Sequence, residues 1–239
     1  LADKYKVREY VQSLGLGDTL VKLYGRWDKA SDIDWDRLPN QFVLKVNNGC
    51  GDILICRDKD KLDKATVIDT YDRLVSIKYG DVTGEPHYAR IQPCVIAEEL
   101  LDINKQSINT SSLIDYKVWC LNGKPYCIWC AWNRGKEGAD TGVYDLDWNY
   151  HPEWSVFTEH YRQGKEILPK PKCFERMLEV ASKLSEEFPI LRVDLYEVNE
   201  KIYFGELTFT SLGGFMDYLT SEILLDMGSK VRINEISEE

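Results

Sequence analysis

Two carboxylates near the C-terminal end of the chain are spaced so that they could share a divalent cation. Asp194 lies in the apolar run 191–198, and Glu206 lies in the run 202–209. Both runs are rich in β-branched and aromatic residues, and the three residues between them tolerate a turn, so the sequence predicts a β-hairpin. A three-residue turn places Asp194 directly across from Glu206 on the polar face of that hairpin.

The facing carboxylates indicate either a metal site or an ion pair. Like charges directly opposite each other destabilise a sheet, and the repulsion is relieved when the two groups share a proton or a cation. Mg2+ takes carboxylate oxygens and fills its other positions with water and substrate phosphate. The same register brings Arg192 across from Thr208, which leaves a second interpretation open: a solvated sheet face on which one acid pairs with Arg192.

The composition is that of an ordinary soluble protein. The 239 residues are 44% hydrophobic and 29% charged, which fits one large domain or two small lobes. No apolar run approaches the roughly 20 residues that span a bilayer, and no signal-like segment opens the chain, so we expect a cytoplasmic protein. The net charge of -10 argues against a nucleic-acid surface, which needs clustered Lys and Arg. The first residue is Leu rather than Met, which leaves open a further N-terminal segment.

A glycine-containing loop between two apolar strands is a candidate phosphate site. The strands are residues 41–46 and 53–56, and the loop between them carries Gly49 and Gly51. Glycines let successive backbone N–H groups converge on phosphate oxygens, and Lys45 just before the loop adds a point charge. The alternative is a plain turn beside a snorkelling lysine. The loop is not a P-loop, which needs GKS or GKT followed by a helix.

The middle of the chain supplies further polar groups at strand ends. A short apolar strand runs into Glu98 and the residues that follow it, an arrangement typical of a hinge that contacts adenine. Asp115 and Lys117 share one face of a strand in a hairpin that turns at Asn122-Gly123. Residues 133–170 read as a long, irregular, functional segment.

The cysteines predict buried thiols rather than a metal or redox site. Seven cysteines are scattered along the chain, and only Cys127 and Cys130 have CxxC spacing. These two lie in a strand-like run, where residues three apart point to opposite faces. No second ligand pair accompanies them, and the three histidines show no ligand spacing.

In this order, these features resemble the ATP-grasp superfamily and, within it, the TupA-like ATP-grasp proteins of bacterial polysaccharide biosynthesis. The resemblance covers almost the whole chain. The segments that carry it are residues 3–10, 38–45, 115–117, 122–123, 144–148, 192–196 and 204–209.

The resemblance implies an α+β ATP-grasp fold in which two lobes with mainly antiparallel sheets clamp Mg-ATP. The first lobe would be residues 1–98 and the second, carrying the metal site, residues 99–239. The implied nucleotide contacts are Lys45, Gly49, Cys50, Gly51, Glu98, Glu99, Leu100, Leu101, Asp115 and Lys117. The implied Mg2+ ligands are Asp194, Glu206 and Thr208, and the implied catalytic cations are Arg192 and Lys117.

Three positions depart from the family pattern. The loop usually reads His-Gly-Ser-Gly, whereas this chain has Asn48 and Cys50. Thr208 stands where Asn is frequent, and no Pro follows Phe209. These changes bear on the loop geometry and on metal affinity, and they leave the charged residues in place.

The implied function is an ATP-dependent carboxylate–amine ligase that acts through an acyl phosphate. The expected carboxylate is a uronic acid of a capsular or related glycan, or an amino acid, and the second substrate is an amine. Arg90 and Arg134 are the candidates for holding the carboxylate, because a guanidinium matches it bidentately; a surface salt bridge is an equal alternative for each. Other functions left open are a kinase or glycosyltransferase that uses the same nucleotide site, and a non-catalytic ATP-binding partner of a polysaccharide assembly complex.

Overall fold

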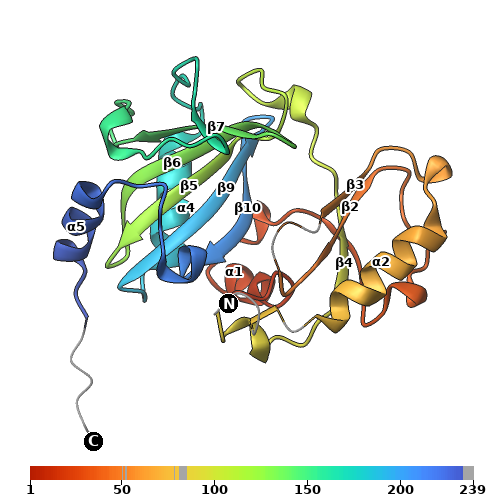
Figure 1. The fold of residues 1–239 in the computed structure, drawn as a ribbon. Helices are drawn as coiled ribbons and strands as arrows, with labels where there is room; N and C mark the ends of the chain where they lie inside the picture. The colour runs from red at the N-terminus through yellow and green to blue at the C-terminus, as the bar shows by residue number, and fades with distance from the viewer. Residues whose placement is uncertain (50, 52, 78, 81–84, 234–239) are drawn as a thin grey trace, which may run out of the picture. The chain divides into compact units, whose positions relative to one another are not determined.

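The computed structural model describes the chain except for residues 50, 52, 78, 81–84 and 234–239. Its contacts divide the chain into two compact units, Leu1–Leu101 and Asp102–Glu239. Each unit contains one sheet of mainly antiparallel strands with helices packed against it (Figure 1). The predicted α+β class with two mainly antiparallel sheets is confirmed. In the described part of the chain, no helix is both long and apolar enough to cross a membrane.

The N-terminal unit is organised around a four-stranded sheet with the order β1-β4-β2-β3. Its strand pairs are antiparallel. The helices and strands of this unit are α1 (Val7–Ser13), β1 (Leu23–Trp27), β2 (Phe42–Val46), β3 (Ile53–Cys56), α2 (Lys64–Ser76) and β4 (Val95–Glu98).

The two faces of β2 have different environments. Leu44 points into an apolar cluster that also contains Tyr71 of α2. Lys45 lies on the opposite face, directly across from Ile53 of the edge strand β3. Ile53 and Ile55 are 55% and 52% exposed. The glycine-loop hairpin therefore presents a lysine beside two exposed apolar side chains.

The C-terminal unit contains a six-stranded sheet with the order β10-β9-β5-β6-β7-β8. The β7–β8 pair is parallel, and the other pairs are antiparallel. The helices and strands of this unit are β5 (Asp115–Leu121), β6 (Lys124–Gly135), β7 (Gly138–Tyr144), β8 (Tyr161–Gln163), α4 (Phe174–Ser185), β9 (Ile190–Val198), β10 (Lys201–Thr208) and α5 (Ser221–Lys230).

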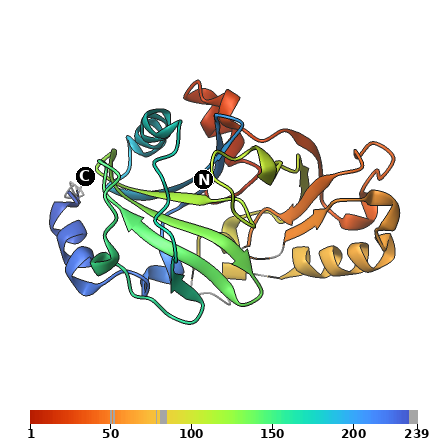
Figure 2. The same ribbon diagram turned by 90° about the horizontal axis from the view of Figure 1, so that it is seen from above.

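Both faces of this second sheet are covered. Helix α4 packs across β5, β6 and β9 on one face (Figure 2). The segment 211–231 covers part of the other face, where its Tyr218 joins Trp119 of β5 in an apolar cluster. Lys117 lies two residues before Trp119 on the same strand. Arg192 lies directly across from Trp119 on β9. These cations therefore share the face that the C-terminal segment covers.

The prediction of an irregular segment over residues 133–170 is wrong for its first part. β6 continues to Gly135, and residues 138–144 form β7, which pairs with it. The sequence of β7 contains Gly138, Asp140 and Gly142, residue types that are depleted in strands. Pairing with β6 and burial of most of its residues compensate for this low propensity. β1, which contains Gly25, was not predicted either.

The turn between β9 and β10 differs from the predicted one, yet the predicted carboxylate pair is confirmed. Asn199 and Glu200 both have φ of +55°, as in a two-residue type I′ turn. Val198 therefore faces Lys201 and not Ile202. A β-bulge between Phe204 and Glu206 then shifts the register by one residue and brings Asp194 across from Glu206.

Gly205 at this bulge has no room for a larger side chain. A Cβ atom there would lie 2.9 Å from the Asp194 carbonyl oxygen and 3.0 Å from Tyr196 Cε2. The bulge therefore depends on a residue without a Cβ atom.

We expect Gly205→Ala to lower the free energy of unfolding by about 1–3 kcal/mol, because the added methyl group must displace backbone or an aromatic ring. The measurement is urea denaturation followed by tryptophan fluorescence. Gly135→Ala is the matched control, since nothing lies within 4 Å of the Cβ position there. Equal stability of the two variants would contradict a steric requirement at the bulge.

Candidate functional site

Asp194 is the centre of a buried group of charges in the C-terminal unit. It is 1% exposed. Arg192 binds it with two nitrogens, Nε to Oδ1 at 2.7 Å and Nη2 to Oδ2 at 2.9 Å. Lys117 Nζ also binds Oδ2, since β5 lies beside β9 and Lys117 faces Asp194 across the pair. The interpretation of this face as solvated is wrong, but its pairing of an acid with Arg192 is confirmed.

The charges around Asp194 keep its carboxylate ionised. Burial alone would raise the pKa of Asp194, but the charges and hydrogen bonds of Arg192 and Lys117 outweigh this effect and hold that pKa well below its ordinary value. Burial would lower the pKa of Arg192, yet Asp194 raises it above its ordinary value. Both groups are therefore charged at neutral pH.

The ion pairs extend on both sides of Asp194. Lys117 Nζ lies 3.6 Å from Asp115 Oδ2, and Arg134 Nη2 lies 2.5 Å from the same oxygen. On the other side, Arg192 Nη2 lies 3.6 Å from Glu206 Oε1. Acids and bases thus alternate along the network in the order Arg134, Asp115, Lys117, Asp194, Arg192 and Glu206.

The two arginines proposed to hold a substrate carboxylate lie in different compact units. Arg134, on β6, is bound to Asp115 and its side chain is 44% exposed. Arg90 is an exposed residue at the end of the 3-10 turn Tyr88–Arg90 in the N-terminal unit. Within the C-terminal unit, Arg134 lies next to the Asp194 network through its ion pair with Asp115.

In the N-terminal unit, Glu98 pairs with the lysine proposed to bind phosphate. Glu98 is 6% exposed. Lys45 Nζ lies 2.6 Å from its Oε2, and Arg8 Nη1 lies 3.1 Å from its Oε1. Sequence reasoning did not single out Arg8, although it stands on the polar side of a short amphipathic helix within a family segment. Glu98 thus fixes two cations on the face of the sheet that carries Ile53.

Polar side chains tie the start of the glycine loop to neighbouring segments. Asn47 Nδ2 donates to Asp3 Oδ1 at 2.9 Å, and its Oδ1 accepts from the Cys94 backbone N–H at 2.7 Å. The Gly49 carbonyl accepts from Lys4 Nζ at 2.6 Å. Gly51 has φ of +89°, a conformation that favours glycine. Cys50, a predicted phosphate contact, lies outside the described residues.

The backbone N–H of Glu99, in the predicted adenine hinge, already has a hydrogen-bond partner within the N-terminal unit. The N–H of Glu99 donates to the Lys22 carbonyl at 2.9 Å, because β4 continues beside β1. Leu101 is buried, and Leu100 is half-buried. The adenine contact expected of residues 98–101 stays a prediction.

The residues present fit a magnesium–nucleotide complex. Among the described residues, no three His, Cys, Asp or Glu side chains are arranged to hold a metal ion. Asp194 and Glu206 supply two facing carboxylates with Thr208 two residues further on, a set that suits Mg2+ when phosphate and water complete its shell. Asp115 Oδ1 is buried and has no hydrogen-bond partner among the described residues, so it can accept from a ligand hydroxyl.

The segment after β10 contacts Arg192 and also lines a cavity. Ser211 Oγ accepts from Arg192 Nη1 at 2.9 Å.

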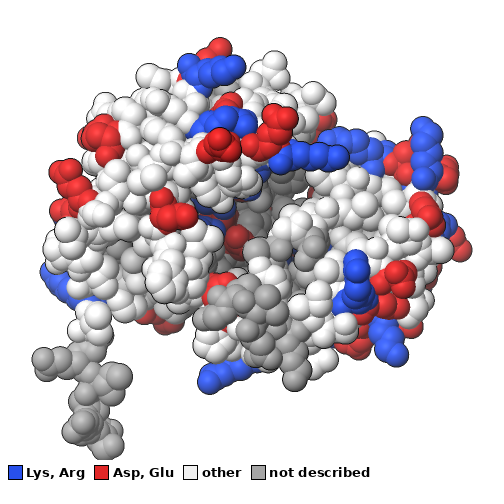
Figure 3. All heavy atoms as spheres, viewed as in Figure 1, with Lys and Arg blue, Asp and Glu red and all other residues white. Residues whose placement is uncertain are grey.

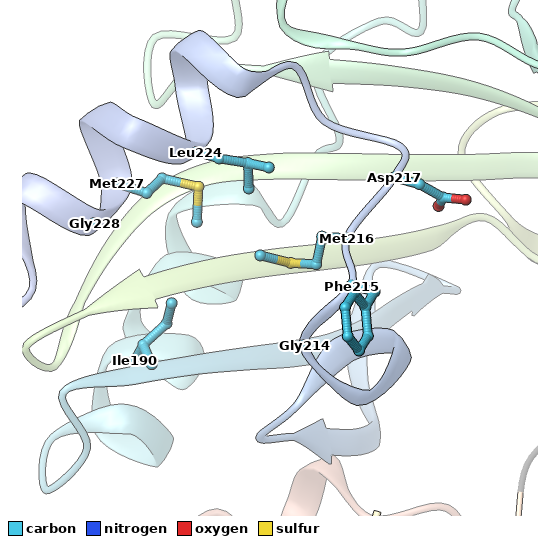
Figure 4. A pocket seen from close by; sticks show the side chains of 8 residues that line it. All are labelled: Ile190, Gly214, Phe215, Met216, Asp217, Leu224, Met227 and Gly228. Carbon is cyan, nitrogen blue, oxygen red and sulfur yellow. The ribbon is translucent and has the colours of Figure 1, made fainter. Parts of the chain in front are cut away.

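Further along the segment that follows β10, Met216 borders a cavity of about 550 Å³ between this segment, β9 and α5 (Figure 4). The lining residues are Ile190, Gly214, Phe215, Met216, Asp217, Leu224, Met227 and Gly228.

Five of the described cysteines are buried, as predicted, whereas Cys173 is half-buried and Cys50 lies outside the described residues. Cys127 and Cys130 are both fully buried and face Trp119 and Tyr116 across the β5–β6 pair, on opposite sides of the sheet. Burial raises the pKa of both thiols.

On the face shown in Figure 3, acidic and basic side chains lie side by side.

The family model for TupA-like ATPgrasp proteins matches residues 1–232. The chain belongs to the TupA-like ATP-grasp family. Comparison with curated protein sequences gives no significant match.

Solved ATP-grasp enzymes share the fold. D-alanine–D-alanine ligase from Bacillus anthracis is 16% identical, with a TM-score of 0.55 over 96% of this chain and 66% of the ligase. Biotin carboxylase from Campylobacter jejuni, in a β-γ-ATP complex, is 14% identical, with a TM-score of 0.52 over 98% of this chain and 47% of the carboxylase. This chain therefore spans between about half and two thirds of the length of these enzymes. The predicted family and the ATP-grasp fold are confirmed.

We expect Asp194→Asn to lower the free energy of unfolding by about 3–5 kcal/mol, because Arg192 and Lys117 lose a buried counter-ion. Glu206→Gln should cost less than about 1 kcal/mol, since the Glu206 side chain is 31% exposed. Chemical denaturation at pH 7 measures both.

The effect of Asp194→Asn should also depend on pH in one direction. A depressed carboxyl pKa contributes stability above the unfolded value of about 3.9, and this contribution is lost as the pH falls towards the folded pKa. The difference between the wild type and Asp194→Asn should thus be constant from pH 5 to 8 and should shrink below about pH 4. A difference that shrinks between pH 5 and 8 would contradict the assignment.

Proposed function

We propose that this protein is an ATP- and Mg2+-dependent carboxylate–amine ligase. The observation that carries the proposal is the facing pair Asp194 and Glu206, with Arg192 and Lys117 bound to the same buried carboxylate. A site for the transfer of a phosphoryl group needs cations at the oxygens that gain charge and carboxylates that hold the metal. Family membership supports this reading of the network.

Each unit contains side chains that we propose as nucleotide contacts. In the N-terminal unit, Lys45 and the Gly49 and Gly51 loop bind phosphates, and Ile53 with Ile55 offers apolar surface to the adenine ring. Lys45 is held in place by Glu98 at 2.6 Å. In the C-terminal unit, Asp115 accepts from a ribose hydroxyl through Oδ1, which has no partner among the described residues.

Asp194, Glu206 and Thr208 would hold Mg2+, which neutralises phosphate oxygens when bound. Arg192 and Lys117 stabilise the charge that develops on the transferred group. A substrate carboxylate oxygen attacks the γ-phosphorus, the bond to the β–γ bridging oxygen breaks, and ADP leaves. The amine nitrogen then attacks the carbonyl carbon of the acyl phosphate, loses a proton and expels inorganic phosphate. These steps require no nucleophilic side chain.

The substrate class that we propose is a uronic acid or an amino acid joined to an amine in cytoplasmic steps of polysaccharide biosynthesis. Arg134 is placed to bind the carboxylate, because its guanidinium is partly exposed beside the network. It would then exchange Asp115 for the substrate. Arg90, an exposed residue of the N-terminal unit, is the second candidate.

Thermal unfolding with ATP and Mg2+ tests the nucleotide site. Ligand at about 100 times its dissociation constant should add about 2.7 kcal/mol to the stability of the folded protein. We expect a magnesium-dependent rise in Tm for the wild type and a smaller rise, measured against its own ligand-free Tm, for Glu206→Gln. Glu187→Gln, a change at an exposed acid of the same unit, should behave like the wild type. No rise in the wild type at millimolar ATP would refute the proposal.

The reaction type is tested by ADP release from ATP with panels of uronic acids and amino acids. A ligase should release ADP only when a carboxylate and an amine are both present. A phosphorylated product without amine would identify a kinase, and transfer of a sugar would identify a glycosyltransferase. Nucleotide binding without turnover would favour a non-catalytic partner.

A further inference from the structure

We propose that Ser211 and Tyr218 position the Arg192 guanidinium for the transferred phosphoryl group. This inference rests on the proposed function, because it assumes that Arg192 meets that group. Neither residue was singled out from the sequence. Both are 5% exposed, and both lie in the segment that follows β10.

The three side chains form a short hydrogen-bonded chain. Arg192 Nη1 donates to Ser211 Oγ at 2.9 Å, and Ser211 Oγ lies 2.8 Å from Tyr218 Oη. A hydroxyl can donate one hydrogen bond and accept two. Ser211 can therefore accept from Arg192 and still exchange a hydrogen bond with Tyr218.

Tyr218, at the end of this series of hydrogen bonds, packs among aromatic side chains. The Tyr218 ring lies 5.0 Å from the ring of Trp129 and 6.2 Å from that of Tyr161. It also belongs to the apolar cluster on this face of the sheet. Packing in the core therefore fixes the Tyr218 hydroxyl. Tyr218 in turn fixes Ser211 Oγ, which accepts the hydrogen bond from Arg192.

The donor count of Arg192 shows what this arrangement leaves for a ligand. A guanidinium has five N–H donors in one plane. Asp194 takes one from Nε and one from Nη2, and Ser211 takes one from Nη1. Each terminal nitrogen keeps one further N–H that can donate to a phosphoryl oxygen, and Glu206 Oε1 lies 3.6 Å from Nη2. With Asp194 alone, the guanidinium would be fixed along one edge only.

The backbone beside Ser211 is held in an unusual conformation. Leu212 has φ of 50° and ψ of 40°, and Gly213 follows with φ of 63°. A left-handed conformation is unfavourable for a residue with a Cβ atom, and Leu212 gains little from burial because it is 51% exposed. This turn starts directly after the residue that binds Arg192, which is consistent with a conformation kept to place Ser211.

The test compares two nucleotides that differ at the γ-phosphate. The affinities of Mg2+–AMPPNP and Mg2+–ADP are measured by isothermal titration calorimetry for the wild type, Ser211→Ala and Tyr218→Phe. We expect Ser211→Ala to weaken AMPPNP about tenfold, equivalent to 1.4 kcal/mol, with ADP affinity unchanged. Tyr218→Phe should act in the same direction by a smaller factor.

Two further variants separate positioning from general damage. Ser211→Thr keeps the hydroxyl and should restore the preference for AMPPNP. Thr220→Val is the control, because the Thr220 hydroxyl contacts the Glu153 carbonyl in the same unit and not Arg192. If Ser211→Ala does not fold, Tyr218→Phe, which keeps the ring, still decides the question.

An AMPPNP-to-ADP ratio that stays at the wild-type value in both hydroxyl variants would overturn the inference. So would an equal loss of both nucleotides, since that indicates a purely structural role. If the wild type binds neither nucleotide, the proposed function itself fails and takes this inference with it. If it binds both with equal affinity, Arg192 does not meet the γ-phosphate, and only the inference is lost.

Discussion

The arrangement of the C-terminal unit follows from one buried charge, the carboxylate of Asp194. A charge that is removed from water needs partners, and here they come from the same strand and from its neighbour, as Arg192 and Lys117. Lys117 faces Asp194 only if β9 keeps its register with β5. The bulge at Gly205 then sets the register with β10, so that the acid on that strand faces Asp194 and not a neighbouring residue.

The two faces of the sheet are covered by different elements, and the charge network lies on one of these faces. Helix α4 packs on the face that carries no network residue, and the segment after β10 brings Ser211 to Arg192. In the N-terminal unit, Glu98 plays a comparable part, since it holds Arg8 and Lys45 on one face of the sheet. In both units a buried acid binds a cation proposed to meet phosphate, Lys45 in one and Arg192 with Lys117 in the other.

The sequence was sufficient to predict the elements with strong local patterns. The β9–β10 hairpin, the glycine-loop hairpin and the Asp115–Lys117 strand have clear alternation and turn residues, and the family segments add their order. The two-residue turn at Asn199-Glu200 could not be predicted, because Glu carries no signal for a positive φ. The bulge at Gly205 could not be predicted either, because its register shift cancels the shift from the shorter turn, and Asp194 still faces Glu206. β7 was missed because pairing with β6 outweighs its poor strand propensity. The partners of Asp194 on β5, and of Arg192 after β10, come from residues distant in sequence, so only the fold reveals them.

The most direct test of this account is a crystal structure of the protein with AMPPNP and Mn2+ in place of Mg2+, with data collected at a wavelength where manganese scatters anomalously. The account predicts an anomalous peak between the carboxylates of Asp194 and Glu206, next to the triphosphate, with Arg192 still bound to Ser211 and in contact with the γ-phosphate. A nucleotide bound away from these residues, or manganese that does not contact Asp194, would contradict the account.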